Sequence, residues 1–323
     1  MKLPRRKFLG LVLGAAALPF APHIARAQTY PSRPVRLVVG FAPGGTADII
    51  ARLIGQWLSE RLGQQFIIEN RPGASTNIAT EAVVKAQPDG HTLLIVASSN
   101  AVNATLYDKL NFEFLRDIRP VAGLTRSSFF WVTNSSFPAR TMPELIAFAK
   151  ANPGKLNIGG ASPTQQVAVE LFKMIVGANM LYVPYRGDAP GLTDLMGGQV
   201  EMYLGGAAAV VEPIKAGRLR ALAVTTAARS EALPDIPAMV EFVPGYEASA
   251  FFGVGAPRNT PVEIIDKLNR EINAGLVDPR IKARIADMGN TMLAGSSGDF
   301  DKLIADEVEK WGKVVKFAGM KPE

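Results

Sequence analysis

The stretch that decides the fold is PVRLVVGFAPGGTADIIARLIGQWLSERLG, residues 34–63. Residues 34–40 form an apolar run rich in β-branched side chains, which predicts a strand, and the glycines at 44 and 45 interrupt it. From Thr46 to Leu62 the apolar residues recur at helical spacing, and Gly63 is a typical helix stop. The stretch therefore predicts a strand, a turn of small residues and a helix in succession.

The same pattern recurs three times further along the chain. Expected strands at 92–97, 155–158 and 200–204 precede small-residue turns at 98–100, 159–164 and 205–208. Each turn leads into an expected helix. Strands that alternate with helices are typical of an α/β fold with a mainly parallel sheet, in which ligands bind beyond the carboxyl ends of the strands. The four turns are therefore the first candidates for a binding site.

Composition excludes several classes of function. The 323-residue chain has no Cys, and its two histidines are His23 and His91, which excludes disulfides, cysteine nucleophiles and histidine-rich metal centres. The segment from Gly40 to Gly45 lacks the pattern of a phosphate-binding loop and that of a dinucleotide site. The Gly-x-Ser-x-Gly elbow of α/β hydrolases is missing as well. We therefore expect a protein that is not an enzyme and uses no cofactor or metal.

Residues 1–27 predict a secretory signal. A basic start, an apolar run over residues 8–20 and a small-x-small site at Ala25-Arg26-Ala27 are typical of one. The pair Arg5-Arg6 allows either the twin-arginine or the Sec route. Cleavage after about Ala27 would remove five basic residues and lower the formal charge from +6 to +1. We therefore expect a periplasmic protein without the basic surface that nucleic-acid binding needs.

Several motifs resemble those of Bug-type proteins, the extracytoplasmic solute-binding components of tripartite tricarboxylate transporters. They are YPSRPVRLVV at 30–39, FAPGGTAD at 41–48, ENRPGA at 69–74, PDGHTLL at 88–94, VPYRG at 183–187, DLMGGQV at 194–200, GRLRALA at 217–223, LPDIP at 233–237 and AP at 256–257. The motifs follow the family's order from about Tyr30 to the C-terminus.

The resemblance implies a type II periplasmic-binding-protein fold, in which two α/β lobes joined by a hinge hold a ligand between them. Lobe 1 would comprise residues 28–126 plus 251–323 and lobe 2 residues 127–250, with crossings near Thr125 and Ala250. Family members bind small carboxylates, such as di- and tricarboxylates, acidic amino acids, nicotinate or aromatic acids. The implied partners are the membrane subunits of the transporter, and we expect a monomer. The alternatives are a protein that serves a sensor kinase and an exported α/β enzyme.

The candidate ligand-binding residues come from the four turns and from the family's pocket. They are Phe41, Ala42, Pro43, Gly44, Gly45, Thr46, Asp48, Ser98, Ser99, Asn100, Ala161, Ser162, Thr164, Gln165, Gly205, Gly206 and Ala207. A carboxylate that leaves water needs directed donors, and the start of a helix supplies backbone N–H groups and a favourable dipole. We predict that main-chain amides, those of Gly44 and Gly45 above all, hold the carboxylate without help from a cationic side chain.

Two residues leave alternatives open. Asp48 either stabilises the helix dipole or accepts a hydrogen bond from an amino or hydroxyl group of the ligand. Arg186 either clamps an anion together with Tyr185 or pairs with Asp188 or Asp194.

Three further features bear on the site and the core. Phe41 either packs at its strand end or forms a wall of the cleft. Relatives commonly carry a His within the segment at 162–166, which reads SPTQQ here, so ligand identity does not transfer from them. Residues 298–319 predict an amphipathic helix that docks on a lobe, and Trp57, Trp131 and Trp311 are expected in the core.

Overall fold

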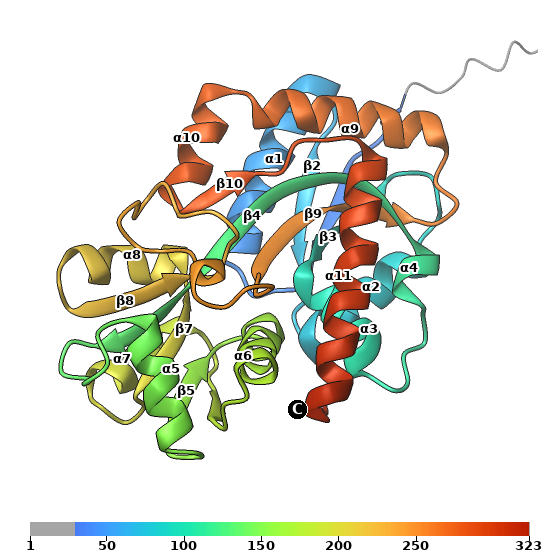
Figure 1. Ribbon diagram of the computed structural model, residues 1–323. Helices are drawn as coiled ribbons and strands as arrows, with labels where there is room; N and C mark the ends of the chain where they lie inside the picture. The colour runs from blue at the N-terminus through green and yellow to red at the C-terminus, as the bar shows by residue number, and fades with distance from the viewer. Residues whose placement is uncertain (1–29, 323) are drawn as a thin grey trace, which may run out of the picture.

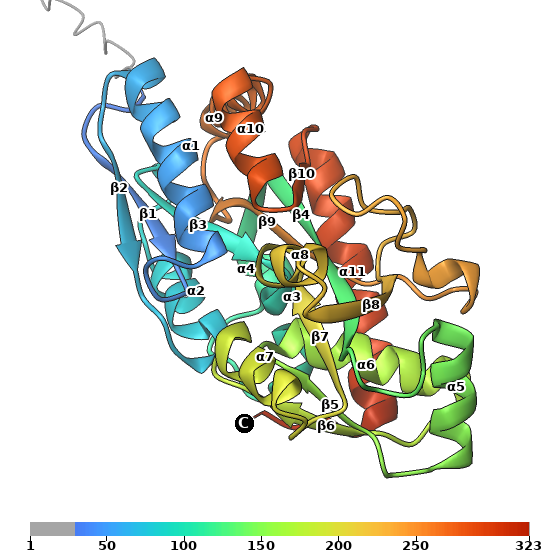
Figure 2. The ribbon, with the colours of Figure 1, turned by 90° about the vertical axis from the view of Figure 1, so that its left-hand side faces the viewer.

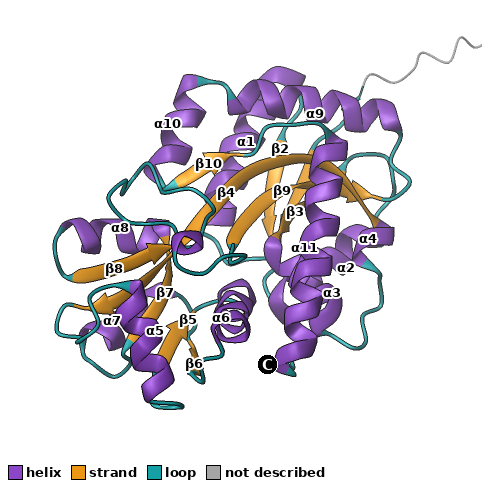
Figure 3. Cartoon of the chain, viewed as in Figure 1, coloured by secondary structure: helices purple, strands orange, loops and turns teal. Residues whose placement is uncertain are grey.

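The computed structural model describes residues 30–322, so the predicted signal segment lies outside the described residues. Within this range the strands follow the order β2-β1-β3-β9-β4-β7-β5-β6, with β8 and β10 also paired to β4. Helices flank the strands on both sides (Figures 1 and 3). The expected two-lobed α/β fold is therefore confirmed.

Lobe 1 is built on a mixed sheet. Its strands are β1 (Val35–Val39), β2 (Phe66–Asn70), β3 (Thr92–Ala97), β9 (Ser249–Pro257), β10 (Asn290–Met292) and the first part of β4 (Ile118–Asn134). β1 is parallel to β2 and β3, whereas β9 is antiparallel to both β3 and β4. Its helices are α1 (Thr46–Leu62), α2 (Asn77–Val84), α3 (Ser98–Leu106), α4 (Phe114–Asp117), α9 (Val262–Leu276) and α10 (Pro279–Asp287), with the short 3-10 helix η2 (Ala74–Thr76).

Lobe 2 repeats the arrangement on a smaller scale. Its strands are β5 (Asn157–Gly160), β6 (Leu181–Pro184), β7 (Met202–Gly206), β8 (Leu219–Val224) and the second part of β4. β5 is parallel to β6 and β7. Its helices are α5 (Met142–Ala151), α6 (Pro163–Val176), α7 (Asp188–Met196) and α8 (Ala207–Lys215), with the 3-10 helix η3 (Met239–Glu241).

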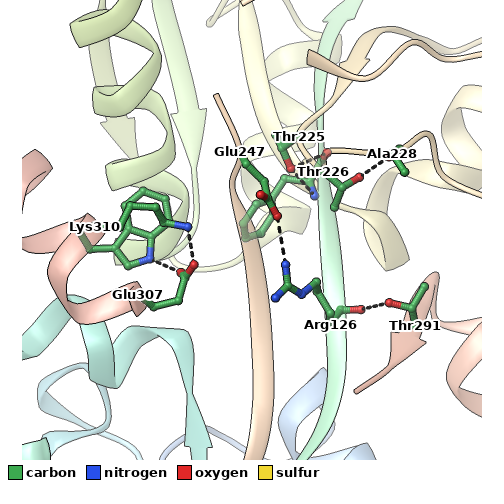
Figure 4. Close-up of polar contacts among 10 residues, drawn as sticks. Arg126, Thr225, Thr226, Ala228, Glu247, Thr291, Glu307 and Lys310 are labelled. Atoms are coloured by element: carbon green, nitrogen blue, oxygen red, sulfur yellow. Dashed lines mark hydrogen bonds and ion pairs between the residues drawn. The ribbon is translucent and has the colours of Figure 1, made fainter. Parts of the chain in front are cut away.

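Strand β4 belongs to both lobes. Residues 118–128 pair with β9, and residues 129–134 pair with β7 and β8. Beside this change of partner, Arg126 Nη1 donates to Glu247 Oε1 over 3.0 Å, and the Thr225 N–H donates to the Phe129 carbonyl (Figure 4). The predicted lobe limits at residues 126 and 251 fall next to this crossing, and the hinge that they imply stays a prediction.

The strand, turn and helix of residues 34–63 form as the sequence predicts. Helix α1 begins at Thr46 and ends at Leu62, and Gly63 adopts a φ of 73° at its C-cap. In lobe 2, however, β5 and β7 continue through glycines that the sequence assigns to turns. A Cβ added to Gly159 would lie 2.6 Å from the Tyr203 ring, and one added to Gly160 would lie 2.6 Å from the Tyr182 hydroxyl. Glycine therefore lets two tyrosines pack directly on the strand.

The C-terminal helix α11 (Ser297–Ala318) covers both lobes. It packs against α3 and β4 and also against α6 of lobe 2, as Figure 2 shows. Its Trp311 is fully buried, which confirms the predicted core position. Among residues 30–322 no helix combines the length and apolar character that a membrane span requires.

Trp131 of β4 anchors the core of lobe 2. Its side chain is fully buried, and its ring lies 4.5 Å from that of Phe172 in α6. Its indole N–H also donates to the Tyr246 hydroxyl over 3.3 Å. The tryptophan therefore joins the shared strand to α6 and to the segment that returns toward lobe 1.

We predict that Trp131→Ala lowers the free energy of unfolding by about 3–5 kcal/mol, because it leaves a large cavity beside Phe172. Denaturant titration followed by circular dichroism measures the change. Phe317→Ala is the control: this side chain is 64% exposed on α11, so the change should stay within about 0.5 kcal/mol. Equal effects of the two substitutions would contradict the assignment of Trp131 to the core.

Candidate functional site

A cavity of about 420 Å³ lies between the two lobes, and we call it the inter-lobe cavity. Residues of both lobes line it: Gly40, Phe41, Gly45, Thr46, Ala47, Gly73, Ser75, Thr76, Ala97, Ser98, Ser99, Ser127, Phe129, Ala161, Ser162, Pro163, Thr164, Gln165, Gly187, Asp188, Gly206, Ala250 and Phe252. Its volume suits a small organic molecule.

Most of the candidate residues line this cavity. They are Phe41, Gly45, Thr46, Ser98, Ser99, Ala161, Ser162, Thr164, Gln165 and Gly206. The other candidates lie outside the lining: Ala42, Pro43, Gly44, Asp48, Asn100, Gly205 and Ala207. The four turns identified from the sequence thus meet at one cavity, although some of their residues support the walls from behind.

Six α-helices begin at the inter-lobe cavity. The first residues of α1, α2, α3, α6, α7 and α8, or the caps just before them, belong to its lining. The caps Gly45, Gly187 and Gly206 provide no side-chain hydrogen bond to their helices. Helix starts carry unpaired N–H groups and the positive end of the helix dipole. The cavity therefore attracts anions, although no Lys, Arg or His is among its lining residues.

Asp48 fixes the first turn from behind. Its carboxylate accepts the Gly44 N–H at 2.9 Å, two hydrogen bonds from the Arg52 guanidinium at 2.9 Å each, and one from Asn70 at 3.0 Å. The side-chain hydrogen bond from Arg52 is the main reason that the pKa of Asp48 falls to about 2. Asp48 is 3% exposed and lies outside the lining, so its contacts fit a structural role.

The expectation that Gly44 donates to the ligand therefore needs correction. Its N–H is already bound to Asp48, and its φ of 86° is one that glycine adopts without strain. The backbone donors that remain at this wall are those of Gly45, Thr46 and Ala47, which precede the first intrahelical hydrogen bond of α1, from the Ile49 N–H to the Gly45 carbonyl.

Phe41 fulfils both of the interpretations that the sequence allows. Its ring packs edge-on against Phe252 of β9, with centroids 6.3 Å apart, and it also lines the cavity. Phe129 of β4 lies in the same lining and is 5% exposed. Three aromatic rings thus supply an apolar part of the wall.

Gln165 organises the opposite wall. Its Oε1 accepts from the Ala161 N–H at 2.8 Å and from the Ser162 hydroxyl at 2.9 Å. Its Nε2 donates to the Leu204 carbonyl at 2.7 Å and to Asp188 Oδ1 at 3.1 Å. Because both ends of the amide already have protein partners, Gln165 orients the wall and holds Asp188.

Neither interpretation of Arg186 fits the structure. Its side chain is exposed and outside the cavity lining, and no ion pair within residues 30–322 includes it. The Tyr185 hydroxyl donates to Asp194 at 2.8 Å instead. The arginine is therefore neither an anion clamp in this conformation nor the partner of Asp188.

Sequence reasoning missed several lining residues. The sequence suggests Asp188 only as a partner for Arg186, whereas Ser127, Phe129, Ala250 and Phe252 come from the strands that cross between the lobes. The positions of Ser127, Ala250 and Phe252 follow from pairing between β4 and β9, and that of Phe129 follows from pairing between β4 and β7, which no local pattern reveals.

Ser75 and Thr76, which follow the ENRPGA motif, are not among the candidate residues from the sequence. Both line the cavity, and both have positive φ values, 50° and 81°. Non-glycine residues seldom adopt this conformation, so Ser75 and Thr76 form a strained turn at the wall.

The Ser99 hydroxyl is a further polar group of this wall. Ser99 is 5% exposed and lines the cavity. Its Oγ is buried and has no hydrogen-bond partner among the described residues. Buried hydroxyls normally have a partner, so this one is available to a bound molecule.

Comparison with known proteins adds to this geometry. The family model of the tripartite tricarboxylate transporter family receptor matches residues 50–320. Protein BugT of Bordetella pertussis is 36% identical over 300 residues, which cover 91% of this chain and 92% of that protein.

Solved structures agree with the sequence comparison. R. palustris Rpa4515 with adipate superposes with a TM-score of 0.81 at 37% identity, covering 91% of this chain and 100% of that chain. MatC from Rhodopseudomonas palustris with bound malate superposes with a TM-score of 0.77 at 29% identity, covering 88% of this chain and 100% of that chain.

We predict that Asp48→Asn lowers the free energy of unfolding at pH 7 by about 1–2 kcal/mol. The loss is limited because water reaches Arg52 and screens its ion pair with Asp48. A depressed pKa stabilises the fold above the ordinary carboxyl range, and this contribution disappears as the pH falls toward 2. The difference from the unmodified protein should therefore shrink between pH 4 and pH 2.

Urea titrations across this pH range measure the difference. The control is Asp266→Asn, which changes an exposed carboxylate of α9 and should give a small difference at every pH. A penalty for Asp48→Asn that stays constant down to pH 2 would contradict the role given to the Arg52 pair.

Proposed function

The chain belongs to the tripartite tricarboxylate transporter receptor family, and on this basis we propose that it is a periplasmic solute-binding protein for a small carboxylate. It captures the carboxylate between its lobes and delivers it to the membrane subunits of a tripartite tricarboxylate transporter. It acts as a monomer and releases its ligand chemically unchanged. Residues 1–27 direct its export and are removed after about Ala27.

One observation carries the proposal: six α-helices begin at a cavity that has no cationic side chain in its lining. A carboxylate that enters the cavity loses water, and backbone N–H groups with the positive ends of helix dipoles replace it. Relatives solved with adipate and with malate support a carboxylate as the ligand. Neutral donors also suit a protein that must release what it binds.

Delivery requires that the ligand favour a closed arrangement of the lobes. A ligand shifts such an equilibrium only by its difference in affinity for the two states. The lobes already meet where α3 and α6 begin, because the Thr164 hydroxyl donates to Ser98 Oγ over 3.4 Å. A ligand held by N–H groups of both lobes strengthens this contact, and we propose the crossing near Arg126 as the hinge.

Calorimetric titration with mono-, di- and tricarboxylates, sugars and simple cations tests the proposed function. We expect at least one carboxylate to bind at micromolar concentration or below and the other classes to give no heat. Native mass spectrometry of freshly purified protein adds the mass of any ligand that remains bound. Tight binding of a sugar, with every carboxylate silent, would overturn the proposal.

We predict that Gly45→Val abolishes measurable carboxylate binding while the protein stays folded. A Cβ at Gly45 would meet no heavy atom closer than 3.8 Å, the Ala42 carbonyl oxygen, so the added side chain occupies space at the cavity wall. Valine at an N-cap costs about 1 kcal/mol of stability. Calorimetry with the best carboxylate measures the loss.

Gly298→Val is the matched control, because it places the same side chain in the exposed first turn of α11, away from the inter-lobe cavity. Its affinity should equal that of the unmodified protein. An unchanged affinity of Gly45→Val would show that the first turn lies outside the binding site.

A further inference from the structure

The inter-lobe cavity contains a carboxylate of its own. Among the described residues that line it, Asp188 is the one with a charged side chain. It is the first residue of α7, and its side chain lies against β7 and α6. A negative charge in a cavity built to attract anions requires an explanation, because it repels a carboxylate placed near it.

The neighbours of Asp188 favour its ionised form. Its Oδ1 accepts from Gln165 Nε2 at 3.1 Å and from the Tyr203 hydroxyl at 3.0 Å, and the Gly206 N–H donates to the same carboxylate. All three groups donate, and an ionised carboxylate only accepts. The start of α7 also favours a negative charge at this position.

No cation of the protein compensates this charge. Within residues 30–322 none of the ion pairs includes Asp188, and neighbouring Arg186 is exposed and unpaired. Burial raises the pKa of Asp188, although the residue is only half-buried. A partly desolvated charge without a counter-charge is unfavourable, so a cation brought by the ligand would be stabilised here.

We propose that the ligand is a carboxylate that also bears a cationic nitrogen, and that Asp188 receives this nitrogen while the helix starts receive the carboxylate. The inference rests on the proposed function and narrows its substrate class from carboxylates to amino-carboxylates. Phe41, Phe129 and Phe252 face the carbon skeleton between the two groups. The role that the sequence suggested for Asp48, acceptance of a hydrogen bond from the ligand, thus belongs to Asp188.

Pairs of probes that share a carbon chain, one member with a cationic group and the other without it, test the inference; in the two dicarboxylate pairs the ammonium group replaces the second carboxylate. Glutarate and 4-aminobutanoate share a three-carbon chain, adipate and 5-aminopentanoate share a four-carbon chain, and 3-phenylpropanoate differs from phenylalanine by one ammonium group. Calorimetric titration of the unmodified protein gives the ratio of affinities within each pair. We expect the amino member to bind at least tenfold more tightly in one or more pairs.

The variant Asp188→Asn tests the residue itself. It keeps the size of the side chain and removes the charge, so affinity for the preferred amino-carboxylate should fall at least tenfold. Affinity for the plain acid of the same pair should stay unchanged or rise, because a repulsive charge is gone. Asp194→Asn is the matched control: it removes one negative charge from the same helix outside the cavity lining, and it should leave both affinities unchanged.

The outcomes separate the inference from the function on which it rests. Plain dicarboxylates that bind more tightly than every amino member would overturn the inference and leave the carboxylate receptor in place. An Asp188→Asn protein with unaltered affinities would overturn it as well. The ratios measured on the unmodified protein remain decisive even if the variant fails to fold. Failure of every carboxylate to bind would overturn the proposed function too.

Discussion

The rest of this structure depends on one constraint: an anion can leave water for the inter-lobe cavity only if backbone N–H groups replace its hydration. Side-chain cations are missing from the lining, so the main donors come from the starts of helices, and the Ser99 hydroxyl adds to them. Helices that follow strands of two different sheets begin at one point only where those strands end toward each other. The order of strands, with β4 shared between the lobes, produces that meeting.

Polar side chains behind the walls make this arrangement rigid. Asp48 holds the turn before α1, and Gln165 holds the start of α6. Asn100 does the same for α3: it accepts the Ala97 N–H at 2.8 Å and donates to Thr76 and Thr80 at 2.9 Å each. Each of these side chains uses its hydrogen-bonding capacity within the protein, so the turn that it holds keeps one backbone conformation.

The two walls differ in their electrostatics. The wall of lobe 1 offers main-chain amides and the serine hydroxyls of α3, whereas the wall of lobe 2 adds the carboxylate of Asp188. The wall of lobe 1 attracts anions and the carboxylate in the wall of lobe 2 repels them. Such a cavity orients a ligand that has one anionic end and one end of different charge. Under the proposed function, this asymmetry between the lobes is the feature by which the cavity would distinguish one small acid from another.

The sequence by itself determined the local structure and the chemical class of the site. The limits of α1 follow from its helical spacing and Gly63, and small-residue turns after four strands mark where a ligand approaches backbone. Only the tertiary structure decided which groups of each turn face the cavity. Gly44 and Asp48 satisfy each other, and Asp188 lines the cavity although it lies more than 100 residues beyond the first turn. Hydrogen bonds and strand pairing between residues distant in sequence determine which groups face the cavity. A local sequence pattern does not indicate these contacts.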